Sequence, residues 1–575
     1  MYKRLFSFLL LLVLAGCAGT GRFGDDISQP EPDEPVVDVF LYADEADLRR
    51  LYSRNPRSDQ RIDGFVRFEP RGRIHGLRGG FRFRGNTSRY HPKKSFNIRF
   101  SRPQEILFGG YHLNLNAMYT DPSAIRERLG WEMFHYLGQP ASKTRYVALY
   151  INDSYEGLGI HIQRVDELLL AQNGLDPNGT LIRDMTRRNN EALGLERQSI
   201  FGHDLSAEPD KAAFLAGVFN SRWNPEYTHV AELIQWVYDT EAGADFETGF
   251  TQRFDVENFM DWLALHYIMG DVDAFGDDYW LYRGRQSDSK WKILPWDNDL
   301  SFGKNERDGL TINRELGRYG RGLVQLSDFF AYEYEIDDAG WDNDLISKFL
   351  ATPSLEQKLH DRMNYLMENV FTKSWFEDRI RRQKSVVEPF MTNPPEPKFR
   401  FNERQHHGLI SKYEYHVENV MDFINLRYAF LDRRLNPVDG FAYYASANIE
   451  NTGKIFLTDA EGWTIAWMEV SEFTGNPAIS IESTSVDDVK NGISRRWVVH
   501  IDGGHVEGSL SLFYRNDIAP DGKENWYHQP EAIGNQWDLK IFKDGTALET
   551  TVNPYSNKVT AQVRLDGNAM FMVLE

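Results

Sequence analysis

Aspartates gather in two short stretches near the middle of the chain. The stretches contain, in chain order, Asp271, Asp273, Asp277 and Asp278, and then Asp297 and Asp299. Proteins hold Mg²⁺ with one or two carboxylates plus phosphate oxygens of a substrate, and phosphoryl transfer uses a further carboxylate to orient or deprotonate the acceptor hydroxyl. Together, the two stretches have enough carboxylates both to bind Mg²⁺ and to orient or deprotonate an acceptor hydroxyl.

The position of Asp297 and Asp299 directly after an apolar, strand-like run suggests how they could act together. If both lie on an extended strand end, their carboxylates point to the same side, because alternate strand residues share a face. The same acids could instead cap a helix, form Asx-turns or keep the surface solvated. Two central carboxylates would also suit a glycosidase. Composition alone does not distinguish between a metal site, a structural role and a glycosidase site.

A basic stretch lies much earlier in the chain. It runs from Arg82 and Arg84 through a Gly-Asn-Thr-Ser turn to Lys93 and Lys94. A turn of this kind beside a lysine offers backbone N–H groups and a cation to phosphates, whereas a basic hairpin tip that protects a sheet edge is the alternative. Successive strand residues face opposite sides, so only one of the two lysines can point into a given cleft.

The elements around the acidic stretches follow from the apolar periodicity. The segment Glu257–Met269 has a helical period and ends directly before the first stretch, and Tyr279–Arg283 and Trp291–Leu294 predict a hairpin before the second. A helix is predicted from Asp121, as N-cap, to Leu137. Further helices are predicted at Asp344–Leu350, Leu355–Val370 and Tyr413–Leu435, and early strands at Gly79–Arg84, Ser95–Phe100 and Tyr146–Asn152.

After Pro437 the pattern changes to short alternating strands separated by Gly, Asn and Asp turns. The predicted strands are Lys454–Thr458, Trp463–Val470, Arg496–Ile501 and Ser509–Tyr514. We therefore expect a separate β-sandwich-like domain at residues 438–575. Its tryptophans could stack on sugars, although core packing is the simpler role for such side chains.

The N-terminus predicts export and lipidation. Lys3 and Arg4 precede an apolar run that is too short to span a bilayer, and Ala15 and Gly16 come directly before Cys17. Residues 1–16 therefore read as a lipoprotein signal peptide, and residues 17–36 as a lipidated cysteine with a flexible tether. An ordinary secretory signal is the alternative. Cys17 is the only cysteine, so no internal disulfide can form.

The formal net charge of −20 argues against a nucleic-acid-binding protein, because neutralising phosphates needs a concentrated basic face. A small nucleotide site is not excluded, since a few local cations and a metal ion suffice there. No stretch after the signal peptide is apolar for long enough to cross a membrane.

Blocks spread over roughly residues 38–437 resemble the CotH kinases, a family of atypical secreted relatives of protein kinases. The similar blocks include Arg84–Ser88 with Pro92–Phe96, Leu115–Ala117 with Asp121–Arg126, Val147–Gly157, Gly270–Tyr282, and Pro295–Gly303. Neither a Walker-type loop nor a Gly-rich kinase loop is visible. The ordered series of blocks is much more specific than any one motif.

The resemblance implies roles for individual residues. Asp273 would be the catalytic aspartate, Asp297 would bind Mg²⁺ or Mn²⁺ with ATP, and Asp299 is a further metal candidate. Arg84 and one of Lys93 and Lys94 would face the nucleotide.

Three positions depart from the family pattern. Gln163 stands in place of a glutamate, so the resemblance implies that a Lys–Glu ion pair is lost. Asp278 replaces an asparagine at the second metal position, and Arg183 replaces a lysine near the nucleotide. An arginine does not substitute freely for a lysine at a point-charge site.

Together these readings predict an α+β protein with a diverged, two-lobed protein-kinase-like domain at residues 37–437, followed by the all-β domain. The expected activity is metal-dependent phosphoryl transfer to a Ser/Thr or glycan hydroxyl of a surface protein or glycan. The alternative is a non-catalytic surface lipoprotein with a pseudokinase core and a carbohydrate- or protein-binding β domain. The lipid on Cys17 would hold the chain in the bacterial cell envelope, with the outer membrane preferred because Ala18 is not aspartate.

Overall fold

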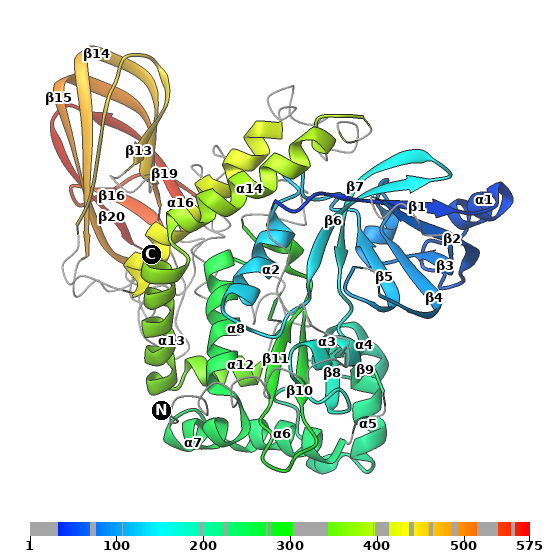
Figure 1. Cartoon of the computed structure of the whole chain (residues 1–575). Helices are drawn as coiled ribbons and strands as arrows, with labels where there is room; N and C mark the ends of the chain where they lie inside the picture. The colour runs from blue at the N-terminus through cyan, green and yellow to red at the C-terminus, as the bar shows by residue number, and fades with distance from the viewer. Residues whose placement is uncertain are drawn as a thin grey trace, which may run out of the picture.

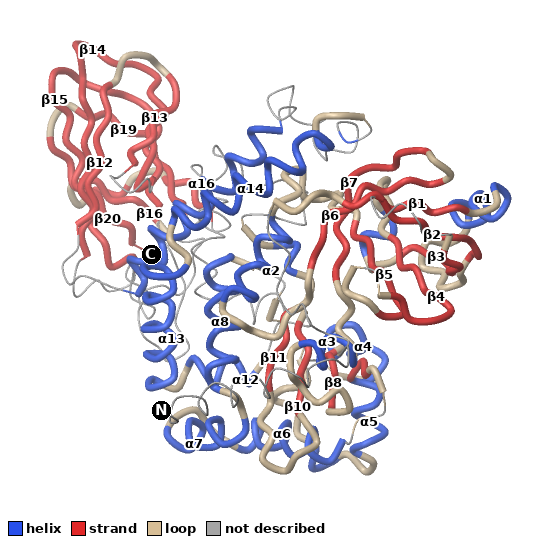
Figure 2. The backbone as a smooth tube through the Cα atoms, viewed as in Figure 1, coloured by secondary structure: helices blue, strands red, loops and turns tan. Residues whose placement is uncertain are grey.

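The computed structural model describes residues 33–69, 76–105, 107–195, 199–223, 225, 227–271, 274–275, 278–302, 343–394, 396, 413–435, 442–458, 464–485, 492–513, 539–553 and 558–574. Figure 1 shows three parts in chain order: a β-rich part, a mainly helical part and a C-terminal β part (Figures 1 and 2). The mixture of helices and strands agrees with the predicted α+β class.

The β-rich part is a closed barrel of seven strands in the order β1-β2-β3-β4-β5-β7-β6. Parallel pairing of β1 with β6 closes it, and its other pairs are antiparallel. Alternate residues such as Val39, Phe81, Ile98 and Leu113 fill the interior. The strands are β1 (Val37–Tyr42), β2 (Ile62–Glu69), β3 (Leu77–Phe83), β4 (Phe96–Gln104), β5 (Gly110–Asn116), β6 (Thr144–Ile151) and β7 (Ser154–Ile162).

The helical part surrounds a four-stranded sheet with the order β11-β10-β8-β9. Its strands are β8 (Thr180–Asp184), β9 (Phe219–Ser221), β10 (Tyr279–Arg283) and β11 (Lys292–Pro295). The described helices of the chain are α1 (Glu45–Ser53), α2 (Arg126–Tyr136), α3 (Glu167–Gln172), α4 (Thr186–Leu193), α5 (Lys211–Val218), α6 (Tyr227–Asp239), α7 (Ala244–Arg253), α8 (Val256–Met269), α12 (Asp344–Leu350), α13 (Pro353–Tyr365), α14 (Lys373–Met391) and α16 (Tyr413–Leu435).

A buried arginine connects the barrel side of the molecule to the helical part. Arg126, at the start of α2, is completely buried and forms an ion pair with Asp121 at 2.7 Å. Its Nε donates a hydrogen bond of 3.1 Å to the carbonyl of Phe302, and the Phe302 N–H donates to Met269 at the end of α8. One side chain therefore fixes α2 to the segment that contains Asp297 and Asp299.

Helix α16 contacts the end of α8 at the same junction. The buried guanidinium of Arg427 donates to the Tyr267 carbonyl in the last turn of α8. Gly270 ends α8 in the left-handed conformation, with φ +60°. A Cβ at Gly270 would lie 2.7 Å from the Phe423 ring. Glycine is thus required at this position for two reasons, its backbone conformation and the close approach of Phe423.

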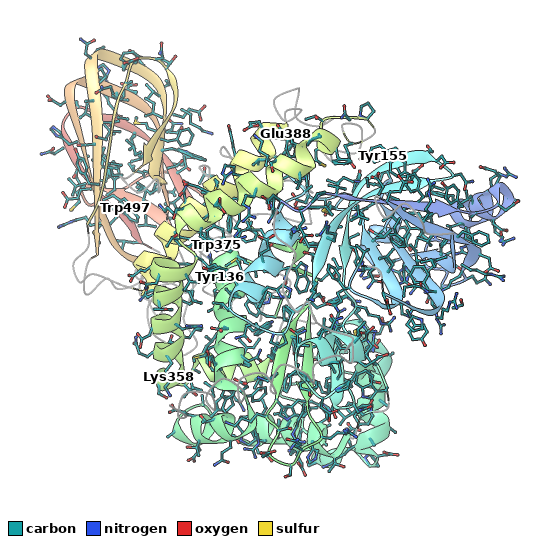
Figure 3. All side chains as sticks on the ribbon, in the orientation of Figure 1. Tyr136, Tyr155, Lys358, Trp375, Glu388 and Trp497 are labelled. Atoms are coloured by element: carbon teal, nitrogen blue, oxygen red, sulfur yellow. The ribbon has the colours of Figure 1, made fainter. Side chains whose placement is uncertain are left out.

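The C-terminal part is built around two strands of 22 residues, β14 (Thr464–Ser485) and β15 (Gly492–Phe513), which pair along their length. Register shifts at two places let each strand bend. Trp497 lies fully buried in the core of this part (Figure 3). The remaining strands are β12 (Ala442–Asn448), β13 (Gly453–Thr458), β16 (Lys540–Lys543), β17 (Thr546–Ala547), β18 (Thr550–Asn553), β19 (Lys558–Leu565) and β20 (Asn568–Leu574).

Several predicted elements are confirmed. The observed bounds of β10, α12 and α16 are the predicted ones, and α8 begins one residue earlier than predicted. Gly138, with φ +69°, follows α2 as expected for a helix end.

Two local predictions were wrong. Helix α2 begins at Arg126 rather than just after Asp121, because the Asp121 carboxylate accepts hydrogen bonds from Ser123 and Arg126 and holds a turn before the helix. The strands predicted at Arg496–Ile501 and Ser509–Tyr514 belong, as far as Phe513, to the single strand β15, because Gly504 and Gly508 between them pair with β14 instead of forming a turn.

The predicted signal peptide and Cys17 lie outside the described residues, as does most of the tether. Among the helices that are described, none has the length and apolarity needed to cross a bilayer.

We predict that Gly270→Ala destabilises the fold more than Gly174→Ala does. Both glycines have a left-handed φ, +60° and +70°, so both substitutions cost about 1–2 kcal/mol of backbone strain. At Gly270 the new methyl group also meets Phe423, which adds about 1–3 kcal/mol, whereas nothing lies within 4 Å of the Cβ position at Gly174. Denaturant unfolding of the two variants measures the difference, and equal losses would contradict the proposed packing.

Candidate functional site

A polar cavity of about 290 Å³ lies where the barrel meets the helical part. It is lined by the ends of β3 and β5, by the start of α2, and by the segments around β10 and β11. Its charged lining residues are Arg84, Glu127, Arg188, Asp278, Asp297 and Asp299. The cavity therefore brings together residues that are more than 200 positions apart in the chain.

Asp297 and Asp299 share this cavity, but not in the predicted way. Strand β11 ends at Pro295, Asp297 adopts the left-handed conformation with φ +57°, and Asn298–Leu300 forms a short 3₁₀ helix. The expectation of an extended strand end was therefore wrong, because the chain turns directly after Trp296. A non-glycine residue with positive φ is uncommon, and such strain is concentrated at functional sites.

Arg84 supplies a positive charge on the barrel side of the cavity. Its enclosure lowers the pKa of the guanidinium, and Asp297 and Glu127 oppose this shift. The group stays cationic at neutral pH because an unperturbed arginine titrates so far above it. The cavity is thus lined both by carboxylates and by the guanidinium groups of Arg84 and Arg188.

Glu127 is a site residue that the sequence reasoning missed. Its carboxylate is buried at the start of α2 and accepts a hydrogen bond of 3.1 Å from Asn116 at the end of β5. The available signal was its position directly after Arg126, inside a block that resembles the CotH kinases. The predicted helix from Asp121 to Leu137 contained Glu127, but no role at the site was predicted for it.

Arg183 and Asp278 form a buried ion pair, with side chains 9% and 3% exposed. Arg183 also lies 6.0 Å from the centre of the Trp296 ring. The two departures from the family pattern therefore compensate each other, because the arginine that replaces a lysine neutralises the aspartate that replaces an asparagine. Leaving one such charge buried alone would cost several kcal/mol.

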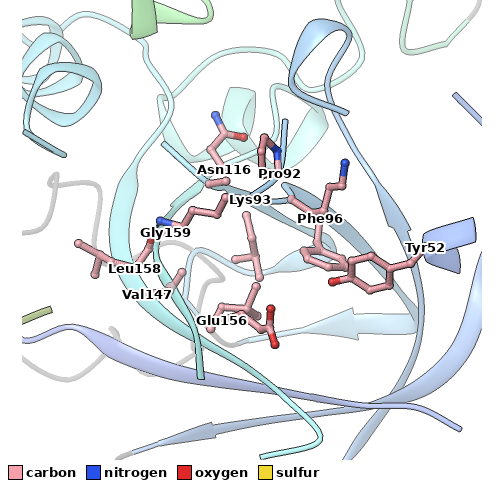
Figure 4. Close-up of a pocket in the computed structure, with 14 residues that line it drawn as sticks. Tyr52, Pro92, Lys93, Phe96, Asn116, Val147, Glu156, Leu158 and Gly159 are labelled. Carbon is pink, nitrogen blue, oxygen red and sulfur yellow. Dashed lines mark hydrogen bonds between the residues drawn. The ribbon is translucent and has the colours of Figure 1, made fainter. Parts of the chain in front are cut away.

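Lys93 and Lys94 line a second, smaller cavity of about 50 Å³ at the barrel strands rather than the acidic cavity (Figure 4). The buried ammonium of Lys93 lies 2.6 Å from Glu396 and donates to the carbonyl of Leu158. Lys94 is half-buried and donates to the carbonyl of Arg89. The prediction that only one of the two lysines can point into a given cleft is wrong for this cavity, because both line it and both precede β4, so strand alternation does not separate them.

Glu396 gives Lys93 the acidic partner that Gln163 was expected to remove. One oxygen of Glu396 accepts hydrogen bonds from both Lys93 and the Leu158 N–H. A Cβ at Gly157 would lie 2.5 Å from this oxygen, so only glycine leaves room for the pair. Lys93 thus pairs with Glu396, from a segment about 300 residues away, and Gln163 takes no part in this ion pair.

Gln163 itself is buried at the end of β7, outside both cavities. It accepts a hydrogen bond from the Lys143 N–H and donates one to Gln172 of α3. Its role in the structure is to attach α3 to the barrel.

The loop after α8 is described only in part. Asp271 is buried and lies 3.2 Å from His266, while Asp273 is outside the described residues. Within the part of the chain that the structure describes, no group of three or more acidic, histidine or cysteine side chains is arranged to hold a metal ion. A site of the Mg²⁺ type needs fewer protein ligands, because substrate phosphates supply the rest.

Comparison with known proteins identifies relatives of most of the chain. The family model described as CotH kinase protein matches residues 81–431. The chain is 23% identical to the inner spore coat protein H of Bacillus subtilis over 365 residues, which are 62% of this chain and 86% of that protein. Two proteins of Rhizopus delemar, invasin CotH2 and invasin CotH3, are each 24% identical. The chain spans about half the length of each invasin, 51% and 45%.

We predict that Lys93→Met destabilises the protein by about 3–5 kcal/mol, because it leaves the Glu396 carboxylate buried without a counter-charge. Adding Glu396→Gln should restore most of this stability, since the amide oxygen can still accept from Leu158. The control is Lys358→Met, which breaks an exposed ion pair with Glu247 and should cost no more than about 1 kcal/mol. A double variant as unstable as Lys93→Met alone, measured by denaturant unfolding, would contradict this account.

Proposed function

Because the chain belongs to the CotH kinase protein family, we propose that it transfers a phosphoryl group from a nucleotide to a hydroxyl group in the acidic cavity. Family membership makes it an atypical kinase-like protein. The observation that carries the proposal further is the joint presence of Asp297, Asp299 and Arg84 in one cavity. Phosphoryl transfer depends mainly on positioning and on electrostatic stabilisation, and this cavity contains groups of both charges.

Asp297 and Asp299 are the proposed metal ligands. Their carboxylate oxygens are the hard donors that Mg²⁺ and Mn²⁺ prefer, so the residues present fit such an ion. A divalent ion held by these carboxylates would offset the negative charge of the phosphate groups. Asp278 is a weaker candidate than the sequence suggested, because its charge is already balanced by Arg183.

Arg84 is the proposed phosphate-facing cation of the barrel side. It lines the acidic cavity, whereas Lys93 and Lys94 line the smaller one. An arginine can form two parallel hydrogen bonds to a phosphate. Lys93 would then support the site from a distance, through its ion pair with Glu396 beside β7.

Asp273 is the proposed group that orients the acceptor hydroxyl. It lies three residues after Gly270, and the start of its loop is fixed by the contacts of Phe423 and Arg427 with the end of α8. The direction in which the chain leaves α8 is therefore set by α16.

We further propose that the protein acts in the bacterial cell envelope, held by lipid on Cys17, on a surface protein or glycan. This proposal is supported by the names of the relatives, one an inner spore coat protein and two invasins. The C-terminal β part, proposed to be sandwich-like, would extend the contact with such a partner. The competing function is a binding protein without catalysis, for which a nucleotide site would not be needed.

The proposal predicts that ATP with Mg²⁺ or Mn²⁺ raises the thermal midpoint of the purified protein. A ligand that binds only the folded state adds about 2.7 kcal/mol of stability at a hundredfold excess over its dissociation constant. Asp297→Asn should remove the metal-dependent part of the shift, because the amide cannot replace the charge of the carboxylate at the ion. Differential scanning fluorimetry measures both effects.

The control for this experiment is Asp378→Asn, which removes one exposed carboxylate on α14 far along the chain from the cavity. It should keep the full shift. If no nucleotide shifts the wild-type midpoint with either metal ion, phosphoryl transfer at this cavity is wrong and the binding-protein alternative replaces it.

The lipid anchor predicts a second outcome. Cys17→Ser should move the protein from the membrane fraction to the soluble fraction of the cells that express it, since no thiol remains to be acylated. Fractionation followed by immunoblotting measures the distribution. A Cys17→Ser protein that stays in the membrane fraction would show that another feature holds it there.

A further inference from the structure

The outer face of the barrel has a ladder of arginines that the proposed phosphoryl transfer does not use. Arg82 on β3 pairs in register with Asn97 on β4, and Arg99 pairs with His112 on β5. Arg61 precedes β2, and its side chain lies over Gly80. A Cβ atom at Gly80 would meet the Cβ and Cδ atoms of Arg61. Alternation along the strands puts these residues on one side of the sheet, opposite the apolar core.

Two more arginines extend this ladder towards the helical part. Arg164 lies two residues after the end of β7, where Ile162 pairs with Asn114 of β5, and its charge acts on His112 of β5. Arg222 follows β9, and its guanidinium lies 4.2 Å from the centre of the Trp280 ring. We call Arg61, Arg82, Arg99, Arg164 and Arg222 the arginine face.

The arginine face has too few carboxylates of its own. Asp59 contacts Arg82 at 2.8 Å, and Asp166 lies 3.7 Å from Arg164. In the ranges that the structure describes, no carboxylate lies within ion-pair distance of the other three arginines. This local excess of positive charge occurs in a chain with a formal net charge of −20.

The positive charges of these groups lower one another's pKa. Burial together with Arg82 and Arg99 lowers the pKa of Arg61 to about 10. Burial and Arg164 lower the pKa of Arg222 to about 9. His112, between them, has a pKa lowered to about 3 by burial and by four of these arginines, so it stays neutral. An anion bound here would relieve repulsion that the protein alone leaves in place.

The arginine face is continuous with the acidic cavity. Arg82 and Arg84 are alternate residues at the end of β3, about 7 Å apart along the strand, and Arg84 lines the cavity. On the opposite side, the charge of Arg183 contributes to lowering the pKa of Arg222, and Arg183 pairs with Asp278 of the cavity. A ligand that covers the face would therefore lead directly into the site.

We propose that the arginine face binds an acidic segment of the protein that accepts the phosphoryl group. An extended peptide with acids at alternate residues carries a row of negative charges on one side, which complements the excess of guanidinium groups on the arginine face. Guanidinium groups match carboxylates in bidentate geometry. The inference rests on the proposed function and adds a substrate class: a hydroxyl-bearing protein with acidic residues beside the acceptor.

The test is binding of a fluorescent peptide of alternating serine and glutamate to the full chain without nucleotide, followed by fluorescence anisotropy. The double variant Arg99→Gln/Arg164→Gln should bind about tenfold more weakly, because it removes two charge-assisted contacts that solvent partly screens. Arg99 is exposed and Arg164 half-buried, so both changes leave the barrel core intact. Arg49→Gln/Arg381→Gln removes two exposed arginines elsewhere, both 72% exposed, and should bind as the wild type does.

Three results would overturn the proposal: equal binding of a serine–glutamine peptide, equal losses in both double variants, and tighter binding of an anionic polysaccharide than of the acidic peptide. The last would assign the face to a glycan.

Nucleotide binding is measured separately, so the two proposals can fail independently. Peptide binding without any nucleotide shift keeps the arginine face and removes phosphoryl transfer; a nucleotide shift without selective peptide binding does the reverse.

Discussion

The junction between the barrel and the helical part depends on the buried guanidinium of Arg126. It neutralises Asp121, and it also donates hydrogen bonds to the hydroxyl of Ser123 and the carbonyl of Phe302. A buried charge is tolerated only when it is paired and hydrogen-bonded, so the turn before α2 and the segment after Asp297 must keep their relative positions. The geometry of the acidic cavity follows from this constraint, since Glu127 and Asp297 lie on the two elements that Arg126 joins.

Two other buried ion pairs also hold together segments that are far apart in the chain. Lys93 with Glu396 ties the barrel to the segment that follows α14, and Arg183 with Asp278 ties β8 to the start of β10. Aromatic contacts add to these connections, such as Tyr136 of α2 against Trp375 of α14, 5.7 Å between ring centres (Figure 3). Each pair would be expensive to break, which gives the surroundings of the cavity a single arrangement.

Local signals predicted the elements that have clear boundaries. The helical period of Glu257–Met269 and its following glycine located α8, and the strand-turn-strand pattern located β10 and β11. Local signals failed where a tertiary contact competes with them. The sequence predicts Asp121 as a helix cap, but its carboxylate accepts a hydrogen bond from the side chain of Arg126 and stabilises a turn before the helix instead. The 22-residue strands of the C-terminal part were read as shorter pieces, because glycines that would end an isolated strand are held there by their partners.

The residue types at the site, the family blocks and the acids Asp278, Asp297 and Asp299 are recognisable in the sequence, because phosphate and metal chemistry needs particular residue types and spacing along one segment is local information. Which charges meet follows from the folding of distant segments onto one another. Lys93 meets Glu396, Arg183 meets Asp278, and Glu127 lines the same cavity as Asp297 and Arg84. These pairs join residues separated by up to about 300 positions, and no local pattern encodes the partner of a buried charge.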